Sequence, residues 1–264
     1  MAVFYVMIFL FGLIIGSFVN VLIYRIPIGK SIVAPSSACT SCGSRLTALD
    51  LVPVLSYIFL KGRCRHCKAP ISPRYPAIEL LNAAIYILLF AKYGFAIPFF
   101  AFAFLMTVLI TVFFIDIDHK IIPDELVITG IVGGAALMVY SFFRPLPEIY
   151  GDIKWWTPVI GFFSGSGFLF LVALLGLLVY KTEDAMGMGD VKLMAPIGLF
   201  LGWKLCLTAL FISVILAGIT SVGLMLLRIK KKKDTIPFGP FIVTGTFVAI
   251  LWGWEIFYWY TGLM

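Results

Sequence analysis

Long apolar segments alternate with short polar stretches along almost the whole chain. A helix that spans a membrane needs about 20 predominantly apolar residues, with a range of about 17–25. Eight segments come close to this length, and we expect each to form a helix: residues 3–24, 77–92, 97–115, 125–143, 157–180, 191–203, 205–227 and 238–262. The second and sixth are short, so we expect them to tilt, to thin the bilayer locally or to end partway across it. The pattern predicts an all-α polytopic membrane protein with about eight transmembrane helices.

The composition supports this prediction. Of the 264 residues, 62% are hydrophobic and 12% are charged, whereas soluble domains have roughly 45–50% apolar and about 25% charged residues. No basic residue precedes the first apolar segment, although a cleavable signal peptide would have a basic region there. We therefore expect the first segment, residues 1–24, to be a retained membrane helix.

Lysine and arginine are distributed unevenly between the polar stretches. If residue 1 faces outward, the cytoplasmic loops hold 16 of the 20 lysines and arginines, in 25–76, 116–124, 181–192 and 228–233. Cytoplasmic loops of membrane proteins carry such an excess, so we expect the N-terminus outside and the loop 25–76 in the cytoplasm. The basic run 228–233 is expected to anchor this topology near anionic lipid, and we expect no nucleic acid as a partner.

The polar stretch 25–76 contains four of the five cysteines, as CTSC and CRHC. Two C-x2-C turns can direct four thiolates at one tetrahedral zinc ion. Disulfides are disfavoured in a reducing cytoplasm. We therefore expect Cys39, Cys42, Cys64 and Cys67 to hold a structural zinc ion, and two disulfide bonds or unpaired thiols are the alternatives.

His66 and Cys206 also have side chains of metal-ligand types. His66 stands inside the second C-x2-C turn, where it could replace a cysteine, but we expect it to be an exposed side chain. Cys206 lies in an apolar segment, and we interpret it as a small buried hydrophobic residue.

Carboxylates interrupt the apolar pattern at two places. Asp116, Asp118 and Asp124 lie in FIDIDHKIIPD, and Asp190 lies in GMGD. The expected topology puts both groups near the cytoplasmic face, and ionisable residues at such a depth are costly unless they are paired or functional. Two carboxyl groups that share a proton can hydrolyse a peptide, since one activates water and the other protonates the carbonyl oxygen.

The preferred partner of Asp190 in such a pair is Asp116. Asp116 directly follows the apolar run TVFFI, so it should be the most desolvated of its group, and Asp118 is the reserve choice. Gly187 and Gly189 would let the backbone leave the helix and approach an extended substrate. Alternatively, Asp190 is only the N-cap of a short helix and the other aspartates are interfacial charges.

A set of motifs, in this order, resembles the bacterial type IV prepilin peptidases, which are bifunctional leader peptidase/N-methyltransferases among the GxGD membrane aspartic proteases. The matching stretches are GSFVNVLIYRIP, CTSC, CRHC, SPRYPAIELLNA, FIDIDHKIIPD, GMGDVKLMAPIG and IPFGPFIVTG. In the family, the first catalytic aspartate precedes the I-P-D aspartate, here Asp124, by eight positions, and the second is the aspartate of GxGD. The resemblance therefore implies that Asp116 and Asp190 are the catalytic pair.

The resemblance also implies a substrate, a methyl donor and a location. The substrates would be prepilins or pseudopilins of type IV pili, type II secretion or DNA uptake, cleaved at the cytoplasmic face of the bacterial inner membrane. The new N-terminal residue would be methylated with S-adenosylmethionine. Because relatives without the cysteine loop only cleave, its presence here favours both activities. A peptidase that uses the loop as a substrate clamp is the alternative, and a transporter with a proton or cation site is disfavoured because no internal repeat is visible.

We expect three parts along the chain: a first transmembrane helix 1–24, a methyltransferase-associated zinc loop 25–76 and a peptidase core 77–264. No glycine-rich dinucleotide fingerprint is present. Candidates for contact with the substrate or donor are Asn20, Arg25, Arg74 and Glu79, although Asn20 and Glu79 could instead form hydrogen bonds between helices.

Two further features near the expected active site remain open in the sequence. Lys192 either reaches the membrane interface or tunes the dyad. Pro237, Gly239 and Pro240 are expected to start or bend the last helix, and a contribution to the substrate site is the second interpretation.

Overall fold

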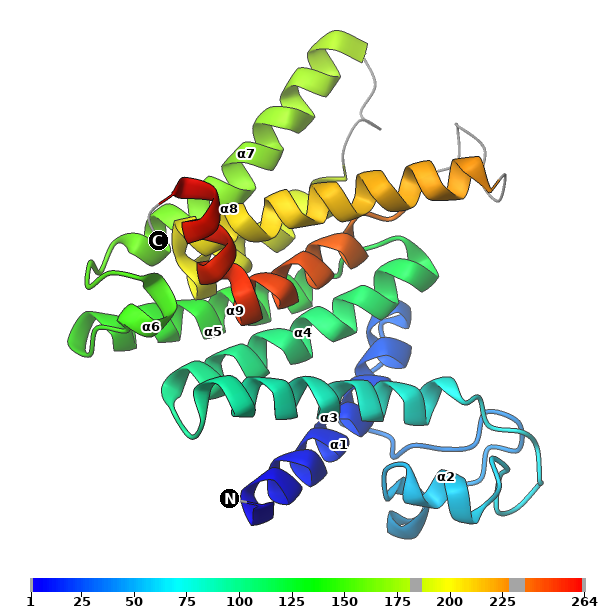
Figure 1. Ribbon diagram of the computed structural model, residues 1–264. Coiled ribbons are helices and arrows are strands. Elements are labelled where there is room, and N and C mark those ends of the chain that lie inside the picture. The colour runs from blue at the N-terminus through cyan, green and yellow to red at the C-terminus, as the bar shows by residue number, and fades with distance from the viewer. Residues whose placement is uncertain (1, 181–186, 228–235, 263–264) are drawn as a thin grey trace. The chain divides into compact units, whose positions relative to one another are not determined.

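A computed structural model describes residues 2–180, 187–227 and 236–262 (Figure 1). Within these ranges the chain is helical, and its only extended pairings are two isolated bridges, Ala38 with Arg45 and Arg63 with Pro70. The chain forms two compact units, Met1–Phe99 (unit 1) and Phe100–Met264 (unit 2). The basic run 228–233, expected to anchor the topology, lies outside the described residues.

Seven of the described helices are long and apolar enough to cross a membrane. They are α1 (Ala2–Arg25), α3 (Arg74–Tyr93), α4 (Ile97–His119), α5 (Asp124–Phe143), α7 (Thr157–Tyr180), α8 (Met188–Leu226) and α9 (Gly239–Thr261). Four short helices connect them: η1 (Ile26–Ile28), η2 (Ala48–Leu51), α2 (Leu55–Phe59) and α6 (Pro147–Tyr150). The all-α polytopic fold predicted from the apolar segments is confirmed.

The expected sixth and seventh membrane segments both lie within α8. The helix is broken at Gly202, whose φ of 69° and ψ of 173° are not helical. Residues other than glycine rarely adopt such a positive φ. A Cβ atom at this position would also lie too close to the side chains of Thr157 and Tyr150. The seven long helices therefore contain the eight apolar segments, because the last two follow one another with only a kink between them.

In unit 1, α1 packs along α3 and the cysteine loop joins them. Polar side chains within these apolar helices form hydrogen bonds between α1 and α3. The side-chain amide of Asn82 donates to the carbonyl of Gly12 at 2.7 Å, and that of Asn20 donates to the carbonyl of Tyr75 at 3.1 Å. The helix-to-helix interpretation of Asn20 is therefore confirmed.

In unit 2, α8 contacts α5, α6, α7 and α9 (Figure 1). The rings of Phe104 on α4 and Phe200 on α8 stack with their centroids 6.0 Å apart. This ring contact joins α4 to α8 within unit 2.

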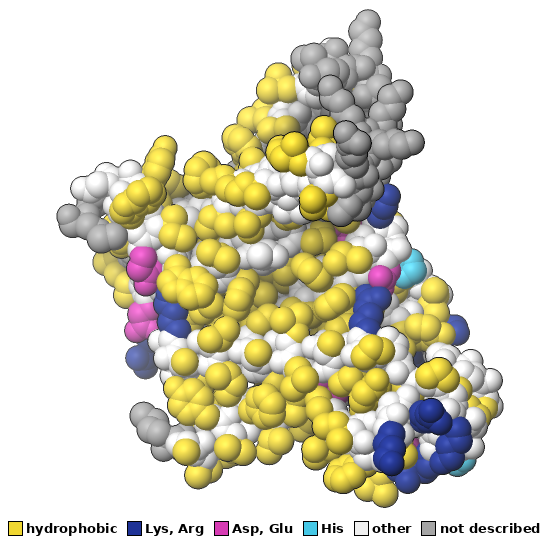
Figure 2. All heavy atoms as spheres, turned by 45° about the vertical axis from the view of Figure 1, so that its right-hand side comes forward, with side chains coloured by type: hydrophobic (Ala, Val, Ile, Leu, Met, Phe, Trp, Pro, Cys, Tyr) yellow, Lys and Arg dark blue, Asp and Glu magenta, His cyan; other side chains and the backbone are white. Residues whose placement is uncertain are grey.

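Much of the remaining helix surface is apolar. Figure 2 shows hydrophobic side chains over most of the helices on the visible face, with lysines and arginines gathered over the cysteine loop. Soluble monomers rarely expose apolar patches of such an extent. The exposed apolar surface therefore fits contact with lipid.

Candidate active site and metal centre

Asp116 is a buried carboxyl group in the last turn of α4. Its exposed fraction is 5%, whereas Asp118 two residues later is exposed. The backbone N–H of Gly239 donates a hydrogen bond to the carboxyl group of Asp116. Among the described residues, the Oδ2 atom of Asp116 has no hydrogen-bond partner. Since buried polar atoms are usually paired, this oxygen is suited to a partner from outside the chain.

Asp190 lies in the first turn of α8 and is half-buried. The N-cap of this helix is Gly187, in an extended conformation, and no side chain caps the helix. The backbone N–H of Asp190 donates to the carbonyl of Gly187 at 3.1 Å. The alternative in which Asp190 is the N-cap is therefore wrong, because the helix begins earlier. Gly189 is helical and faces Ile122, so only Gly187 leaves the helix.

The carboxyl groups of Asp116 and Asp190 lie close enough for the charge of Asp116 to act on Asp190. Both belong to unit 2, where the ends of α4 and α8 carry them. Asp118, two positions after Asp116, is exposed rather than buried. The structure thus brings together the two carboxyl groups that the sequence argument paired, and the Gly239 N–H holds the carboxyl group of Asp116.

Next to this pair, Lys192 forms an ion pair with Asp124. The Nζ atom of Lys192 lies 2.8 Å from Oδ1 of Asp124, and both side chains are exposed. The contact joins the first turn of α8 to the first turn of α5. Neither interpretation of Lys192 foresaw this partner, which lies 68 positions away along the chain.

The start of α9 completes the surroundings of Asp116. The helix begins at Gly239, and Pro240 occupies its first turn, where a missing backbone N–H is tolerated. The prediction that Pro237, Gly239 and Pro240 start the last helix is confirmed. That Gly239 would hold Asp116 was not visible in the sequence, because 123 positions separate the two.

Four cysteines of the loop form a cluster in unit 1. The Sγ atoms of Cys39, Cys42, Cys64 and Cys67 lie within 4.8 Å of one another, and all four are free thiols. The Sγ atoms of Cys39 and Cys67 are 3.8 Å apart, far longer than a disulfide bond of about 2.05 Å. Ligands about 2.3 Å from one tetrahedral ion would be roughly 3.8 Å apart. The cluster therefore fits a metal ion, and the disulfide alternative is wrong.

The two C-x2-C turns have the same backbone pattern. In the first turn, the N–H of Cys39 donates to the carbonyl of Ser44, and the carbonyl of Cys39 accepts the N–H of Gly43. In the second turn, Cys64 makes the same two bonds, to the carbonyl of Ala69 and from the N–H of Lys68. The residue four places after the first cysteine has a positive φ in both turns, 71° at Gly43 and 61° at Lys68. Each turn thus directs two sulfurs to one side, which is the arrangement that a shared ion requires.

The environment of the thiols differs within the cluster. Hydrogen bonds from the hydroxyl and backbone of Ser44 lower the pKa of Cys42 to about 6, and backbone groups of Cys67 and His66 lower that of Cys64. At Cys67, burial and the neighbouring thiols outweigh a backbone hydrogen bond from Ala69, and the pKa rises to about 11. A lowered pKa at Cys42 and Cys64 shifts both toward the thiolate, which is the form that binds metal.

His66 and Cys206 take no part in the cluster. His66 is exposed and lies outside the group of close ligand atoms. Cys206 is fully buried in α8. Both interpretations from the sequence are confirmed.

Comparison with known proteins assigns both parts of the chain. Residues 10–93 match the Bacterial Peptidase A24 N-terminal domain, and residues 103–222 match the Type IV leader peptidase family. A prepilin leader peptidase/N-methyltransferase of Aeromonas salmonicida (strain A449) is 35% identical over 280 residues, which cover 96% of this chain and 92% of that protein. The chain belongs to the type IV leader peptidase family.

Proteins of the same name from other bacteria are similar over nearly the whole chain. The prepilin leader peptidase/N-methyltransferase of Bacillus subtilis (strain 168) is 34% identical, with 96% of both chains covered. That of Legionella pneumophila is 32% identical and covers 98% of this chain and 94% of its own. No solved structure matches the chain. With seven apolar helices, this leader peptidase is a multi-pass protein of the inner membrane.

The part of the leader peptidase that matches the N-terminal domain contains a pocket of about 450 Å3. Three of the residues singled out in the sequence, Asn20, Arg25 and Glu79, line it, and Arg74 does not. Sequence reasoning missed the tyrosines and serines of the same pocket. A signal was present in α1, where Ser17 and Asn20 interrupt an apolar helix three positions apart.

Proposed function

We propose that the chain cleaves the leader peptides of prepilins or pseudopilins with Asp116 and Asp190 and then methylates the new N-terminal residue. The observation that carries this proposal is the proximity of two carboxyl groups from α4 and α8 within one compact unit. Family membership supports the reaction class, and the four-cysteine loop supports the second activity.

Cleavage follows from two carboxyl groups that share one proton. Like charges at close range cannot both be maintained, so one group is ionised while the other keeps its proton. The ionised group takes a proton from water, whose oxygen attacks the peptide carbonyl, and the other group donates its proton to the carbonyl oxygen. On collapse the C–N bond breaks, the leaving amine takes a proton from one group of the pair, and the proton on the former carbonyl oxygen returns to the other as the C=O bond of the new carboxyl group re-forms.

Asp116 is equipped for one of these roles by its surroundings. The Gly239 N–H fixes its carboxyl group, so the side chain needs no rearrangement during the reaction. Its Oδ2 atom lacks a partner among the described residues and is available to water or to Asp190. Donors and acceptors that are fixed in advance contribute strongly to catalysis.

The depth of the pair fits a substrate with a polar leader and an apolar helix. Asp116 lies in the last turn of one apolar helix and Asp190 in the first turn of another, so both belong at the rim of the hydrocarbon layer. A substrate bond at the entrance of a membrane helix would reach the pair without crossing the bilayer. The excess of lysine and arginine in the loops supports an outer N-terminus, with the pair and the cysteine loop at the cytoplasmic face.

Zinc is the proposed occupant of the cysteine cluster. Cys39, Cys42, Cys64 and Cys67 would hold it with four sulfurs, which leaves no open position for substrate. A closed site of this kind contributes folding free energy. We therefore assign zinc a structural role in the loop 25–76, assign methyl transfer to that loop, and assign cleavage to the dyad-bearing segment 77–264.

S-adenosylmethionine is the proposed methyl donor, and prepilin supplies the acceptor amine. Both activities can be read in one experiment, in which the purified protein is incubated with a prepilin and labelled S-adenosylmethionine and the product masses are measured. The expected product is the mature pilin with one added methyl group. A cleaved but unmethylated product would support the alternative function, a peptidase that uses the loop only as a substrate clamp. An uncleaved prepilin would contradict the proposal.

A further inference from the structure

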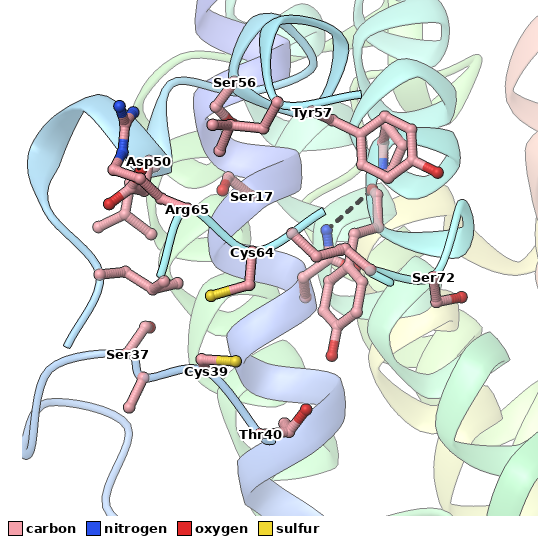
Figure 3. A pocket seen from close by; sticks show the side chains of 18 of the residues that line it. Ser17, Ser37, Cys39, Thr40, Asp50, Ser56, Tyr57, Cys64, Arg65 and Ser72 are labelled. Carbon is pink, nitrogen blue, oxygen red and sulfur yellow. Dashed lines mark hydrogen bonds and ion pairs between the residues drawn. The ribbon is translucent and has the colours of Figure 1, made fainter. Parts of the chain in front are cut away.

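The pocket of unit 1 lies between α1, α3 and the cysteine loop (Figure 3). Its volume of about 450 Å3 falls within the range of roughly 300–1,000 Å3 of sites for small ligands. All of its lining residues belong to unit 1. It is therefore complete without the part of the chain that carries the aspartate pair.

One face of α1 forms a wall of this pocket. The lining residues are Ser17, Asn20, Val21, Tyr24 and Arg25, a spacing that places them on a single helix face. Three of the five are polar or charged, in a helix whose other positions are almost all apolar. Each of the three has a partner within the chain, Asn20 at Tyr75, Arg25 at two carbonyls and Ser17 at Glu79, so the polar wall is fixed in place before any ligand binds.

Glu79 brings a carboxyl group to the pocket, and a cationic ligand beside it would favour the ionised form. Its exposed fraction is 8%, and its Oε2 atom accepts the backbone N–H of Val54 at 2.8 Å. The hydroxyl of Ser17 donates a second hydrogen bond to the same carboxyl group. Among the described residues no ion pair reaches Glu79, so its charge is available to a cationic ligand.

Arg25 brings a positive charge to the same pocket. Its guanidinium group donates to the carbonyls of Ser31 at 2.9 Å and Pro35 at 2.7 Å, and two carbonyls do not cancel its charge. The other charged pair of the lining, Asp50 and Arg65, is joined at 2.7 Å and is neutral as a unit. The pocket therefore has one negative and one positive group left for a ligand.

Aromatic rings and two metal-site cysteines complete the wall. Figure 3 shows Ser17, Tyr57, Cys39 and Cys64 around the cavity. Tyrosine faces bind flat purine rings and cationic groups. Because Cys39 and Cys64 also belong to the four-cysteine cluster, a bound metal ion would fix this part of the wall.

We propose that this pocket binds S-adenosylmethionine, with Glu79 facing its cationic sulfonium and ammonium groups, Arg25 facing its carboxylate and Tyr57 lying against its adenine. The proposal rests on the proposed methyl transfer and names the site for its donor. The donor has two cationic groups, one anionic group and one purine, and the pocket offers a counterpart to each kind.

The first test is donor binding to the purified full-length protein in detergent, measured by calorimetry with S-adenosylmethionine. Glu79→Gln keeps an acceptor for the Val54 N–H and removes the charge, so we expect its Kd to rise about tenfold or more. Tyr57→Ala should weaken binding as well. Phe59→Ala is the matched control, since Phe59 lies on the same short helix, is 81% exposed and is outside the pocket.

Zinc content and melting temperature show whether each variant keeps its fold. If the wild type methylates pilin while both pocket variants bind the donor with wild-type Kd, the pocket assignment is overturned and the proposed function stands. If the wild type cleaves prepilin but neither binds nor uses the donor, methyl transfer fails and the pocket assignment fails with it.

A second test does not depend on substitutions. Ultraviolet irradiation of the protein with radiolabelled S-adenosylmethionine attaches label to aromatic residues in contact with it, and digestion locates the label. We expect it within residues 17–79, at Tyr24, Tyr57 or Tyr75. Label confined to residues 100–226 would overturn the assignment.

Discussion

The backbone of Gly239 lies directly against the carboxyl group of Asp116, although the two residues are 123 positions apart. A Cβ atom on Gly239 would lie 2.5 Å from Oδ2 of Asp116, closer than any real contact. The glycine therefore does two things at once, since its N–H holds the carboxyl group and its missing side chain leaves room for that group.

Gly239→Ala should consequently displace Asp116. We expect leader cleavage to fall about 10-fold to 100-fold, because a displacement on the order of 1 Å at a reacting group can cost about 100-fold in rate. The measurement is kcat/KM for a prepilin peptide. Gly167→Ala is the control, since nothing lies within 4 Å of its added methyl group, and equal losses in both variants would show that the site is not involved.

Asp116→Asn and Asp190→Asn test the catalytic pair itself. Each substitution keeps the shape of the side chain and removes its acid–base function, so cleavage should fall by at least about 1,000-fold, as for other residues that act as a unit. Asp118→Asn, two positions from Asp116 and exposed, should retain cleavage. Normal cleavage by either of the first two variants would contradict the proposed mechanism.

Some of this site follows from the sequence by simple physics. Asp116 directly follows an apolar run, which predicts that it is more buried than Asp118, and in the structure Asp116 is buried while Asp118 is exposed. Long apolar segments predict helices because a backbone in lipid must satisfy its own hydrogen bonds. The break in α8 at Gly202 is harder to foresee, because glycine is also common inside straight membrane helices.

Other parts of the site depend on contacts that no local pattern contains. The N-cap interpretation of Asp190 failed because Asp is favoured both at the cap and in the first turn, and only the helix start decides between them. Gly239 and Lys192 reach Asp116 and Asp124 through tertiary packing. The pocket of unit 1 is assembled from two helices and several turns of the cysteine loop, so its members show no common spacing.

Replacement of the first C-x2-C turn tests the metal site. Cys39→Ser together with Cys42→Ser should release zinc, measured per chain by elemental analysis, because two ligands of a closed site are lost. Methyl transfer should decline more than leader cleavage, since Cys39 lines the pocket of unit 1 and the aspartate pair belongs to unit 2. Cys206→Ala removes a buried thiol outside the cluster and should leave the zinc content unchanged. Equal zinc content in wild type and double variant would reject the metal assignment.

Close packing of α7 on α8 positions the first half of α8. A Cβ atom on Gly198 would enter the backbone of Gly161, and the reverse holds as well. Gly198→Ala should therefore force the helices apart, at a cost of about 1–3 kcal/mol, and lower the melting temperature by several degrees. Gly218→Ala, on the same helix with nothing within 4 Å, should not lower it. An unchanged melting temperature in both would contradict the close contact.

The ion pair of Lys192 and Asp124 links the first turn of α8, which carries Asp190, to the first turn of α5. Both partners are exposed, so their coupling should be only about 0.2–1 kcal/mol. A double-mutant cycle on kcat/KM for cleavage, with Lys192→Met, Asp124→Asn and the combined variant, measures this value. Each single substitution should reduce cleavage by less than about 5-fold, since 1 kcal/mol corresponds to roughly that factor, and the combined variant should be no worse than either.

The coupling should also weaken at about 1 M salt, where charges are screened beyond about 3 Å. Effects that simply multiply in the combined variant would mean that the two residues act separately, and that the ion pair does not position Asp190.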